Sequence, residues 1–438
     1  MNKALILLLI VFSLLLTALV TQNADLIWMA LLCFVYLGTG LLQSPSTREI
    51  RLSATRSVEK DTTHALATIE VSVVIVNQGT AFVRLCLSDP LQAGMSIKNG
   101  QNQQHLHLAA AERAVQMSAI LQASEDAVFK YTFQSERGSF AWETIGVKIS
   151  DPFGLIETEL DLPAEAKIQV RPELNKFRPF PLRPQRTLHS AGSIPARLGG
   201  SGTDFWGVRE YYPGDPLRRL DWRLTARHPH KFFTKEFEQE EIADIGLILD
   251  ARQKTNLRIG EDSLFEHTAR ATASLAEVFL RQGNRVSLLV YQRHIASVYP
   301  GYGKLQLNRV LHTLAQITPE SDDSLNSLQF LPIRMFSSHS LIVIISPLMA
   351  DDWRFFRRLR AYGYQVLLIS PDPLDYAQPI LPTDLDSRLA TRLTRLERQI
   401  EINHIAQLWI PVIDWQVSQP LAPLVRNALR QTRIQRER

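Results

Sequence analysis

The sequence predicts an α/β protein built from an N-terminal transmembrane helical hairpin, a β-sandwich-like middle domain and a C-terminal doubly wound α/β domain. Two uncharged apolar runs open the chain, and apolar residues alternate at a period of two through its middle. Short apolar runs then alternate with helical patterns, which is typical of a parallel sheet covered by helices. The expected domains are residues 1–47, 48–170, 171–240 (a linker and a motif-rich segment), 241–415, and 416–438 (a basic C-terminal helix).

The composition is that of a globular protein of 438 residues, long enough for more than one domain. Lys and Arg number 48 against 44 Asp and Glu, a formal charge of +4. That excess is too small to indicate nucleic-acid binding. The only cysteines are Cys33 and Cys86, which excludes a disulfide scaffold and a four-cysteine zinc site.

Residues 4–20 and 26–42 are the two uncharged runs, each of 17 residues. As a helix such a run measures about 26 Å, at the short end of what crosses a hydrocarbon core of about 30 Å. The link at 21–25 has no basic residue, whereas basic residues flank the runs: Lys3, Arg48, Arg51 and Arg56. The positive-inside rule therefore places both ends, and the bulk of the chain, in the cytoplasm, with membrane lipid as a partner. A signal peptide is the alternative, and it would move the large domain to the other side.

The middle domain shows strand-like alternation without catalytic residues. Three sets of apolar residues alternate: Ile69, Val71, Val73 and Ile75; Phe129, Tyr131 and Phe133; Val147 and Ile149. Short strands separated by turns favour an antiparallel sandwich. His105 and His107 share one strand face, as two metal ligands would, but no third ligand lies nearby in sequence, so a solvated strand face is preferred.

Residues 172–195 are rich in Pro and Arg and are interpreted as an extended linker. The following segment, residues 202–227, mixes aromatic residues of the kind usually buried with closely spaced charges of both signs. Asp215 and Pro216 predict the start of a helix, on which Arg218 and Trp222 would lie four residues apart. The charges either form an ion-pair network that anchors the segment or offer a recognition surface. Nucleic-acid binding is disfavoured because the interleaved acidic residues would repel phosphates.

This segment resembles the bacterial family known as domain of unknown function 58. The shared pattern runs through Gly202, Phe205, Arg209, Tyr211, Gly214, Asp215, Arg219 (or Arg218) and Trp222. Further matching features are Glu236-Phe237-Glu238, Arg137-Gly138, residues 151–155, the two-span N-terminus and the β-domain. The resemblance implies a von Willebrand factor A-type domain, the bacterial inner membrane as location, and a MoxR-type AAA+ ATPase as partner. We expect the interaction surface to consist of Arg209, Asp215, Arg218, Arg219, Asp221 and Trp222.

The C-terminal domain follows a strand–helix alternation. Apolar runs typical of buried parallel strands cover residues 242–249, 285–291, 341–346 and 365–370. Helical spacing occupies residues 264–281, 304–317 and 351–363, and Gly283 follows the first of these helices. These elements predict a doubly wound sheet with right-handed crossovers.

A-type domains often bind a divalent cation after their first strand, through Asp-x-Ser-x-Ser. Here the corresponding residues are Asp250, Arg252 and Lys254, so cationic side chains replace both serines, and Pro347 stands where the family commonly has Asp. We therefore expect a degenerate site without metal, in which Arg252 or Lys254 pairs with Asp250 in place of the ion.

Motifs for catalysis are missing from the sequence: it has no phosphate-binding loop, no nucleophile elbow and no zinc-protease helix. His228-Pro-His230 is expected to cap or pack rather than to bind a ligand. Asp372 and Asp375 lie in a loop after a strand, where ligand sites of α/β folds often occur, but a turn is preferred. Five basic residues occupy the tail: Arg426, Arg430, Arg433, Arg436 and Arg438. We expect them to form a solvated helix face, and the alternative is that they contact anionic lipid.

The sequence thus predicts a membrane-anchored, non-enzymatic adaptor that needs no cofactor and binds no nucleic acid. Its expected role is in the assembly or maturation of cell-envelope or other complexes. Two alternatives stay open: a hydrolase whose site sequence spacing does not reveal, and an extracytoplasmic structural or adhesion module.

Overall fold

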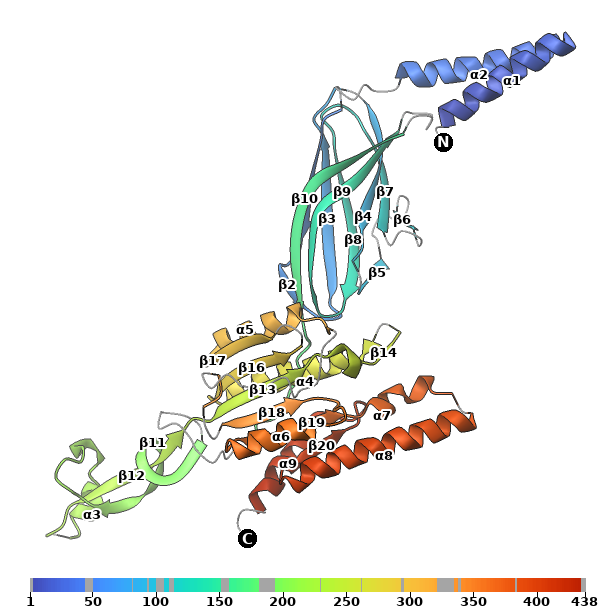
Figure 1. Cartoon of the computed structure of the whole chain (residues 1–438). Helices are drawn as coiled ribbons and strands as arrows, with labels where there is room; N and C mark the ends of the chain where they lie inside the picture. Colours follow the sequence, from blue (N-terminus) through green and yellow to red (C-terminus); the bar gives the residue numbers. More distant parts are fainter. Residues whose placement is uncertain are drawn as a thin grey trace. The chain divides into compact units, whose positions relative to one another are not determined.

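The computed structural model forms two compact units, Met1–Arg171 and Pro172–Arg438 (Figure 1). We call the first the N-terminal unit and the second the α/β unit. The structure describes residues 3–43, 50–80, 82–92, 94–99, 106–109, 114–150, 157–180, 194–228, 230–260, 262–292, 295–320, 335–337, 340–382 and 384–434.

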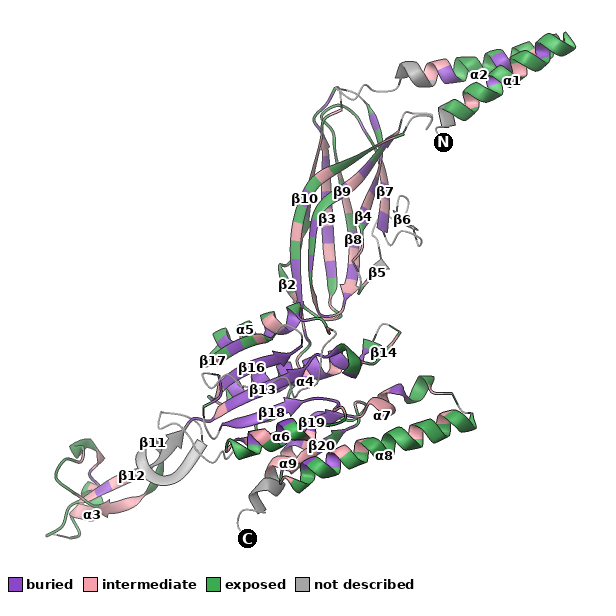
Figure 2. Ribbon diagram, in the orientation of Figure 1, coloured by how far each residue is buried: buried purple, intermediate pink, exposed green. Residues whose placement is uncertain are grey.

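The N-terminal unit begins with a pair of helices, α1 (Lys3–Thr21) and α2 (Ala24–Gln43), joined by a turn at Gln22. Small residues Ala18 and Ala30 are buried where the helices meet, whereas most large apolar side chains of both helices face outward (Figure 2). The predicted helical pair is therefore present. Within the part of the chain that is described, no helix is both long and apolar enough to cross a membrane.

A β-sandwich follows, and the predicted alternation builds its core. One sheet has the order β1 (Leu52–Val58), β3 (Thr68–Asn77), β8 (Asp126–Ser135), β5 (Met95–Asn99). The other has the order β2 (Thr62–His64), β10 (Glu157–Arg171), β9 (Gly138–Ser150), β4 (Val83–Pro90), β7 (Ala114–Leu121), β6 (Leu106–Ala109). Among the described residues of the two sheets, neighbouring strands pair antiparallel, except β2 with β10. Alternate residues of β3, from Ile69 to Ile75, point into the core between the sheets.

One ion pair crosses the interior of the sandwich. Arg56 of β1 donates to Asp89 of β4 from Nη2 at 2.6 Å and from Nε at 3.3 Å, and both side chains are fully buried. Tyr131 of β8 donates its hydroxyl to the same carboxylate at 2.7 Å. The Arg56 guanidinium also donates to the carbonyl oxygen of Ala164 at 2.6 Å, so this residue links both sheets.

The α/β unit opens with residues 172–180, which composition assigned to a linker. This stretch is extended, but it packs against α4 (Leu264–Arg281) through Phe177 and Phe180. The rings of Phe180 and Phe279 lie 6.0 Å apart, and Arg281 donates to the carbonyl oxygen of Phe177 at 2.6 Å. The aromatic side chains therefore make this part of the segment an integral piece of the unit.

The motif-rich segment forms a two-stranded antiparallel ribbon of β11 (Ile194–Glu210) and β12 (Phe233–Glu241). A 3₁₀ turn at Leu217–Arg219 and the short helix α3 (Trp222–Thr225) lie between the strands. We call residues 194–241 the arm.

The doubly wound sheet predicted for the C-terminal domain is confirmed. Its order is β17 (Ala296–Gly301), β16 (Arg285–Tyr291), β13 (Asp244–Asp250), β18 (Leu341–Ile345), β19 (Gln365–Pro371), β20 (Val412–Trp415). Only β17 runs antiparallel to its neighbour among these pairings. Counted in chain order this arrangement is 3-2-1-4-5-6, which reverses direction at β13.

Helices cover both faces of the sheet, whose central strands are buried (Figure 2). On one face lie α4, α5 (Gly303–Gln316) and α9 (Leu421–Ile434), and on the other α6 (Trp353–Ala361) and α8 (Leu385–Gln407). Ile245, Leu247 and Leu249 of β13 face the first layer, and Ile248 faces the second. The remaining short elements are β14 (Arg258–Ile259), β15 (Asp262–Ser263) and α7 (Pro373–Ala377).

Candidate functional site

The carboxyl end of β13 is the first candidate site. The chain leaves β13 toward β16 on one side and later returns to β18 on the other. Ligands of open α/β sheets bind at such a reversal point, beyond the carboxyl ends of the strands. Asp250, the last residue of β13, stands there, where the sequence predicts a degenerate metal site.

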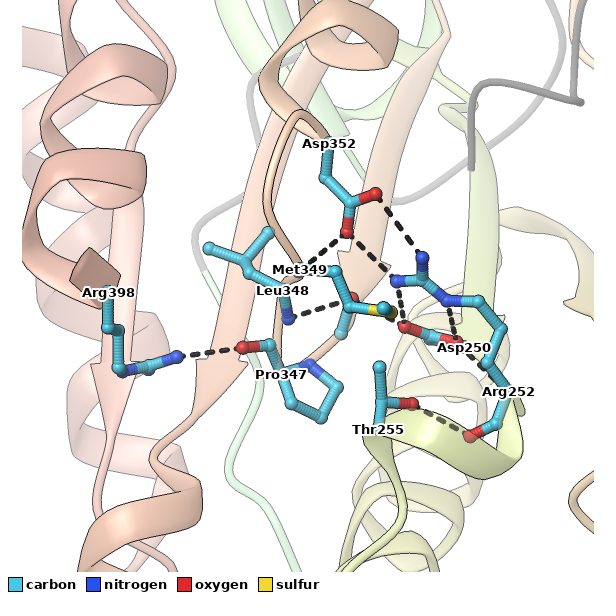
Figure 3. Close-up of polar contacts among 9 residues, drawn as sticks. Asp250, Arg252, Thr255, Pro347, Leu348, Met349, Asp352 and Arg398 are labelled. Atoms are coloured by element: carbon cyan, nitrogen blue, oxygen red, sulfur yellow. Dashed lines mark hydrogen bonds and ion pairs between the residues drawn. The ribbon is translucent and has the colours of Figure 1, made fainter. Parts of the chain in front are cut away.

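Arg252 fills this position (Figure 3). Its guanidinium donates to both oxygens of Asp250, from Nε at 2.9 Å and from Nη2 at 2.6 Å. It also donates to both oxygens of Asp352, from Nη1 at 3.2 Å and from Nη2 at 2.9 Å. The Arg252 side chain is 0% exposed. A single planar cation thus bridges two carboxylates in the interior of the domain.

Other groups complete the hydrogen bonding of these carboxylates. Ser346 donates its hydroxyl to Asp250 Oδ2 at 2.7 Å, and the Met349 amide donates to Asp352 Oδ2 at 2.8 Å. Burial raises the pKa of Asp352, and the contacts with Arg252 oppose that rise. Burial lowers the pKa of Arg252, but hydrogen bonds and charge from Asp250 and Asp352 outweigh it and leave the pKa raised.

Of the two cations expected beside Asp250, the structure selects Arg252, since Lys254 is exposed. Among the described residues, no cluster of three or more His, Cys, Asp or Glu side chains is arranged to hold a metal ion. Sequence reasoning missed Asp352, which lies 100 residues beyond Arg252 and meets it only through the fold. We name Asp250, Arg252, Ser346 and Asp352 the Arg252 network.

The arm is the second candidate site, and Arg209 organises it. The Arg209 guanidinium donates to both oxygens of Asp215, at 2.7 and 2.8 Å, and its Nε donates to Glu236 at 2.7 Å. Hydrogen bonds from Arg209 hold the pKa of Asp215 below its ordinary value, aided by the backbone amide of Tyr212. These contacts tie the loop after β11 to β12.

The predicted role of Asp215 as a helix N-cap is wrong. Residues 217–219 form only a 3₁₀ turn whose N-cap is Pro216, because Asp215 is engaged by Arg209 instead. Asp221 is the residue that caps a helix: its Oδ1 accepts from the amides of Arg223 and Leu224, each at 3.1 Å, at the start of α3. Arg218 and Trp222 consequently lie in different elements rather than on one helix.

The six predicted surface residues divide into two groups. Arg209, Asp215 and Asp221 make the internal contacts above, and the guanidinium of Arg219 lies over the ring of Phe237 at 5.4 Å. These four residues hold the arm in shape. Arg218 and Trp222 instead face outward.

Exposed apolar side chains are a feature of the arm that the sequence predicts only at Trp222. The aromatic residues of this segment are of the kind usually buried, but among the described side chains of the arm six large apolar ones are exposed: Phe205, Trp206, Tyr212, Leu217, Trp222 and Phe232. A ribbon of two strands has no second layer to cover such residues. The signal in the sequence was the density of aromatic residues in a segment too short for a core.

The remaining candidate residues have local structural roles or lie elsewhere. His228 packs edge-on against Phe233 with ring centroids 5.2 Å apart, and Asp372 caps α7 by accepting from the Leu374 amide at 2.9 Å. His105 lies outside the described residues, as do residues 151–155, Arg436 and Arg438. The side chains of His107, Glu238, Arg430 and Arg433 and the surroundings of Gly202 also lie outside the description.

Residues 207–406 match the family model described as "Protein of unknown function DUF58". The family resemblance is thus confirmed for this stretch. "Uncharacterized protein YeaD" of Bacillus subtilis is 29% identical over 147 residues, which is 34% of each chain. An uncharacterized protein of Mycobacterium tuberculosis is 27% identical over 197 residues, which is 43% of this chain and 60% of that protein. The chain therefore spans less than two thirds of the length of these curated relatives.

Two solved structures match parts of the chain. The CARDB domain of a Pyrococcus furiosus protein matches 29% of this chain and 97% of that domain, at 12% identity and a TM-score of 0.19. Proximal thread matrix protein 1 of the mussel byssus matches 43% of this chain and 46% of that protein, at 9% identity and a TM-score of 0.27. Similarity this low carries no argument about function.

Proposed function

We propose that the protein is a membrane-anchored, non-enzymatic adaptor that docks a partner protein on its arm. The observation that carries this proposal is the group of exposed large apolar residues on the arm, held by the contacts of Arg209. Several exposed large apolar residues on one short segment favour an interaction site, and Trp, Tyr and Arg are the residues that contribute most to binding at interfaces. Trp222 and Arg218 provide this chemistry on the arm.

The hydrogen bonding of Asp215 and Asp250, the carboxylates of the two candidate sites, supports an adaptor over a hydrolase. Arg209 engages both oxygens of Asp215 and lowers its pKa, whereas a general base is tuned toward neutral pH. Arg252 and Ser346 engage both oxygens of Asp250. Neither carboxylate is placed to take a proton from a substrate.

The partner we propose is a MoxR-type AAA+ ATPase, with the pair acting in the assembly or maturation of cell-envelope or other complexes. This rests on the family resemblance. The strand order of the α/β unit and its antiparallel edge strand β17 support the further proposal that the unit is a von Willebrand factor A-type domain. In this view the Arg252 network replaces the metal of such domains, so recognition would depend on the arm rather than on a metal.

Trp222→Ala is expected to weaken capture of the ATPase about 30-fold or more, because a buried interface tryptophan often contributes 2 kcal/mol or more. The measurement is cross-linking with mass spectrometry on the full chain in its native membrane, followed by titration with the purified ATPase. Trp409→Ala is the matched control, since Trp409 is 76% exposed, Trp222 is 65% exposed, and Trp409 lies outside the arm. Equal binding by both variants, or absence of the ATPase from every sample, would refute this proposal.

The outward-facing apolar side chains of α1 and α2 support membrane anchoring, because surface of this kind is stable against lipid rather than water. With both ends of the helical pair in the cytoplasm, we expect a protease to digest the α/β unit in inverted inner-membrane vesicles and to spare it in intact spheroplasts. The readout is an immunoblot against the C-terminus, with a periplasmic protein as control. Digestion in spheroplasts would instead favour the extracytoplasmic adhesion module.

A further inference from the structure

Helix α8 carries its apolar stripe on the side that faces away from its own domain. Leu389, Leu393, Leu396 and Ile400 are each between 53% and 60% exposed. Of the whole helix, only Ile402 and Ile405 are buried, and both lie in its last two turns (Figure 2). A surface helix normally turns its apolar stripe toward the core, so this orientation calls for an explanation.

The orientation is fixed by a polar anchor on the opposite side. Arg398 donates to the carbonyl oxygen of Pro347 at 2.8 Å (Figure 3). It also donates to the carbonyl oxygen of Ser370 at 3.2 Å and to Asp414 at 2.6 Å. Its side chain is 8% exposed. Ile405, seven residues later, enters the core beneath the sheet. The spacing of seven places Arg398 and Ile405 on one face of α8, opposite the stripe.

The stripe has the spacing of a coiled-coil seam. Intervals of four, three and four residues place Leu389 and Leu396 at d positions of a heptad and Leu393 and Ile400 at a positions. The anchoring residues Arg398 and Ile405 then fall at f, the position farthest from a partner helix. The same heptad register therefore explains both what α8 buries and what it exposes.

The flanking charges identify the partner. Arg392 falls at a g position and Glu397 at the following e position, five residues later. In a parallel in-register pair, a g residue of one helix meets the e residue of the next heptad on the other helix. Two copies of α8 would thus form this opposite-charge contact twice, through a two-fold axis.

We propose that α8 binds α8 of a second copy of this chain as a short parallel coiled coil. The seam spans only about two heptads, which is too short for isolated peptides to form a stable coiled coil. Here each helix is already folded on its domain, so pairing does not bear the entropic cost of forming the helix. A lipid surface would be a poorer occupant, since Asp386, Glu397 and Glu401 lie among the basic residues of α8. This proposal does not depend on the function of the arm.

Charge reversal tests the pairing in the full chain purified in detergent, with the dimer dissociation constant measured by analytical ultracentrifugation. Arg392→Glu and Glu397→Arg are each expected to raise that constant about tenfold or more, because each puts like charges together at both symmetry-related contacts. The double variant Arg392→Glu/Glu397→Arg restores the opposite charges and is expected to return the constant to within about threefold of the wild-type value. Association through α1 and α2 would not follow this pattern. Equal constants for all four proteins, or a monomeric wild-type chain at every concentration, would overturn the proposal.

Disulfide formation tests the direction of the pair. Leu396→Cys places a thiol at the seam and is expected to cross-link two copies on oxidation. The neighbouring Arg395→Cys, which points away from the seam, is the matched control. The wild-type chain, with Cys33 and Cys86, gives the background level of cross-linking. Positions 389 and 400 lie about 16 Å apart along a parallel in-register pair. A mixed disulfide between a Leu389→Cys copy and an Ile400→Cys copy would therefore show an antiparallel pair and overturn the proposal. Binding of the apolar stripe of α8 to lipid vesicles, without any cross-link at position 396, would also overturn the proposal.

Discussion

Replacing Arg252 by alanine is expected to destabilise the α/β unit by about 3–5 kcal/mol, a large share of the stability of a typical domain. The substitution removes the cation of the Arg252 network and leaves Asp250 and Asp352 buried together as like charges. Hydrogen exchange of β13 and β18 in the full chain measures this loss within the unit that contains the change.

The pH dependence of the defect has a definite sign. Burial already raises the pKa of Asp352 against the opposing contacts of Arg252, and removing the guanidinium raises that folded-state pKa further. The penalty is then largest at neutral and alkaline pH and is relieved as the pH falls through the raised folded-state pKa of Asp352, because this carboxyl group takes up a proton without unfolding. Arg252→Ala/Asp352→Asn, with one buried charge fewer, is expected to be more stable than Arg252→Ala alone at pH 8. A defect of equal size at pH 5 and pH 8 would show that lost packing, not charge, causes it.

The sheets were largely predictable from sequence, because buried strands leave a direct record in it. The apolar run ending at Asp250 matches β13 (Asp244–Asp250), and the alternation from Ile69 to Ile75 matches the inward face of β3. Each pattern depends only on the local periodicity of the strand and on whether other elements cover one face or both faces of its sheet. The order of the strands was not predicted, because local periodicity does not say which strands are neighbours.

The chemistry of the sites was less predictable, because it depends on contacts between distant parts of the chain. Arg252 was a candidate from its position beside Asp250, but its second carboxylate, Asp352, comes from the loop after β18. Trp222 was expected on the interaction surface, but the exposure of the other large apolar residues of the arm was not predicted. Whether a tryptophan such as Trp206 is covered depends on the number of layers around it, which composition does not encode. The outward orientation of α8 likewise depends on backbone carbonyl groups of Pro347 and Ser370 that receive Arg398.

Replacing Arg56 by methionine is expected to destabilise the β-sandwich by about 3–5 kcal/mol. Methionine retains an unbranched apolar stem beside Trp142, over which the Arg56 guanidinium lies at 5.5 Å, so most of the packing is kept. What is lost is the charge opposite Asp89 and the hydrogen bonds to the carbonyl oxygens of Ala164 and Thr144. Hydrogen exchange of β1, β4 and β8 in the full chain reports this change separately from the α/β unit.

Two comparisons separate the charge from the rest of this network. Tyr131→Phe removes one hydrogen bond to Asp89 and leaves the ion pair, so it is expected to cost only about 1–2 kcal/mol. Burial already raises the pKa of Asp89 against the opposing charge of Arg56, and removing that charge raises it further. The defect of Arg56→Met should therefore shrink from pH 8 to pH 5, as Asp89 becomes protonated in the folded chain, while that of Tyr131→Phe should change little. If instead Tyr131→Phe were as damaging as Arg56→Met, the hydroxyl rather than the guanidinium would be what makes burial of Asp89 tolerable.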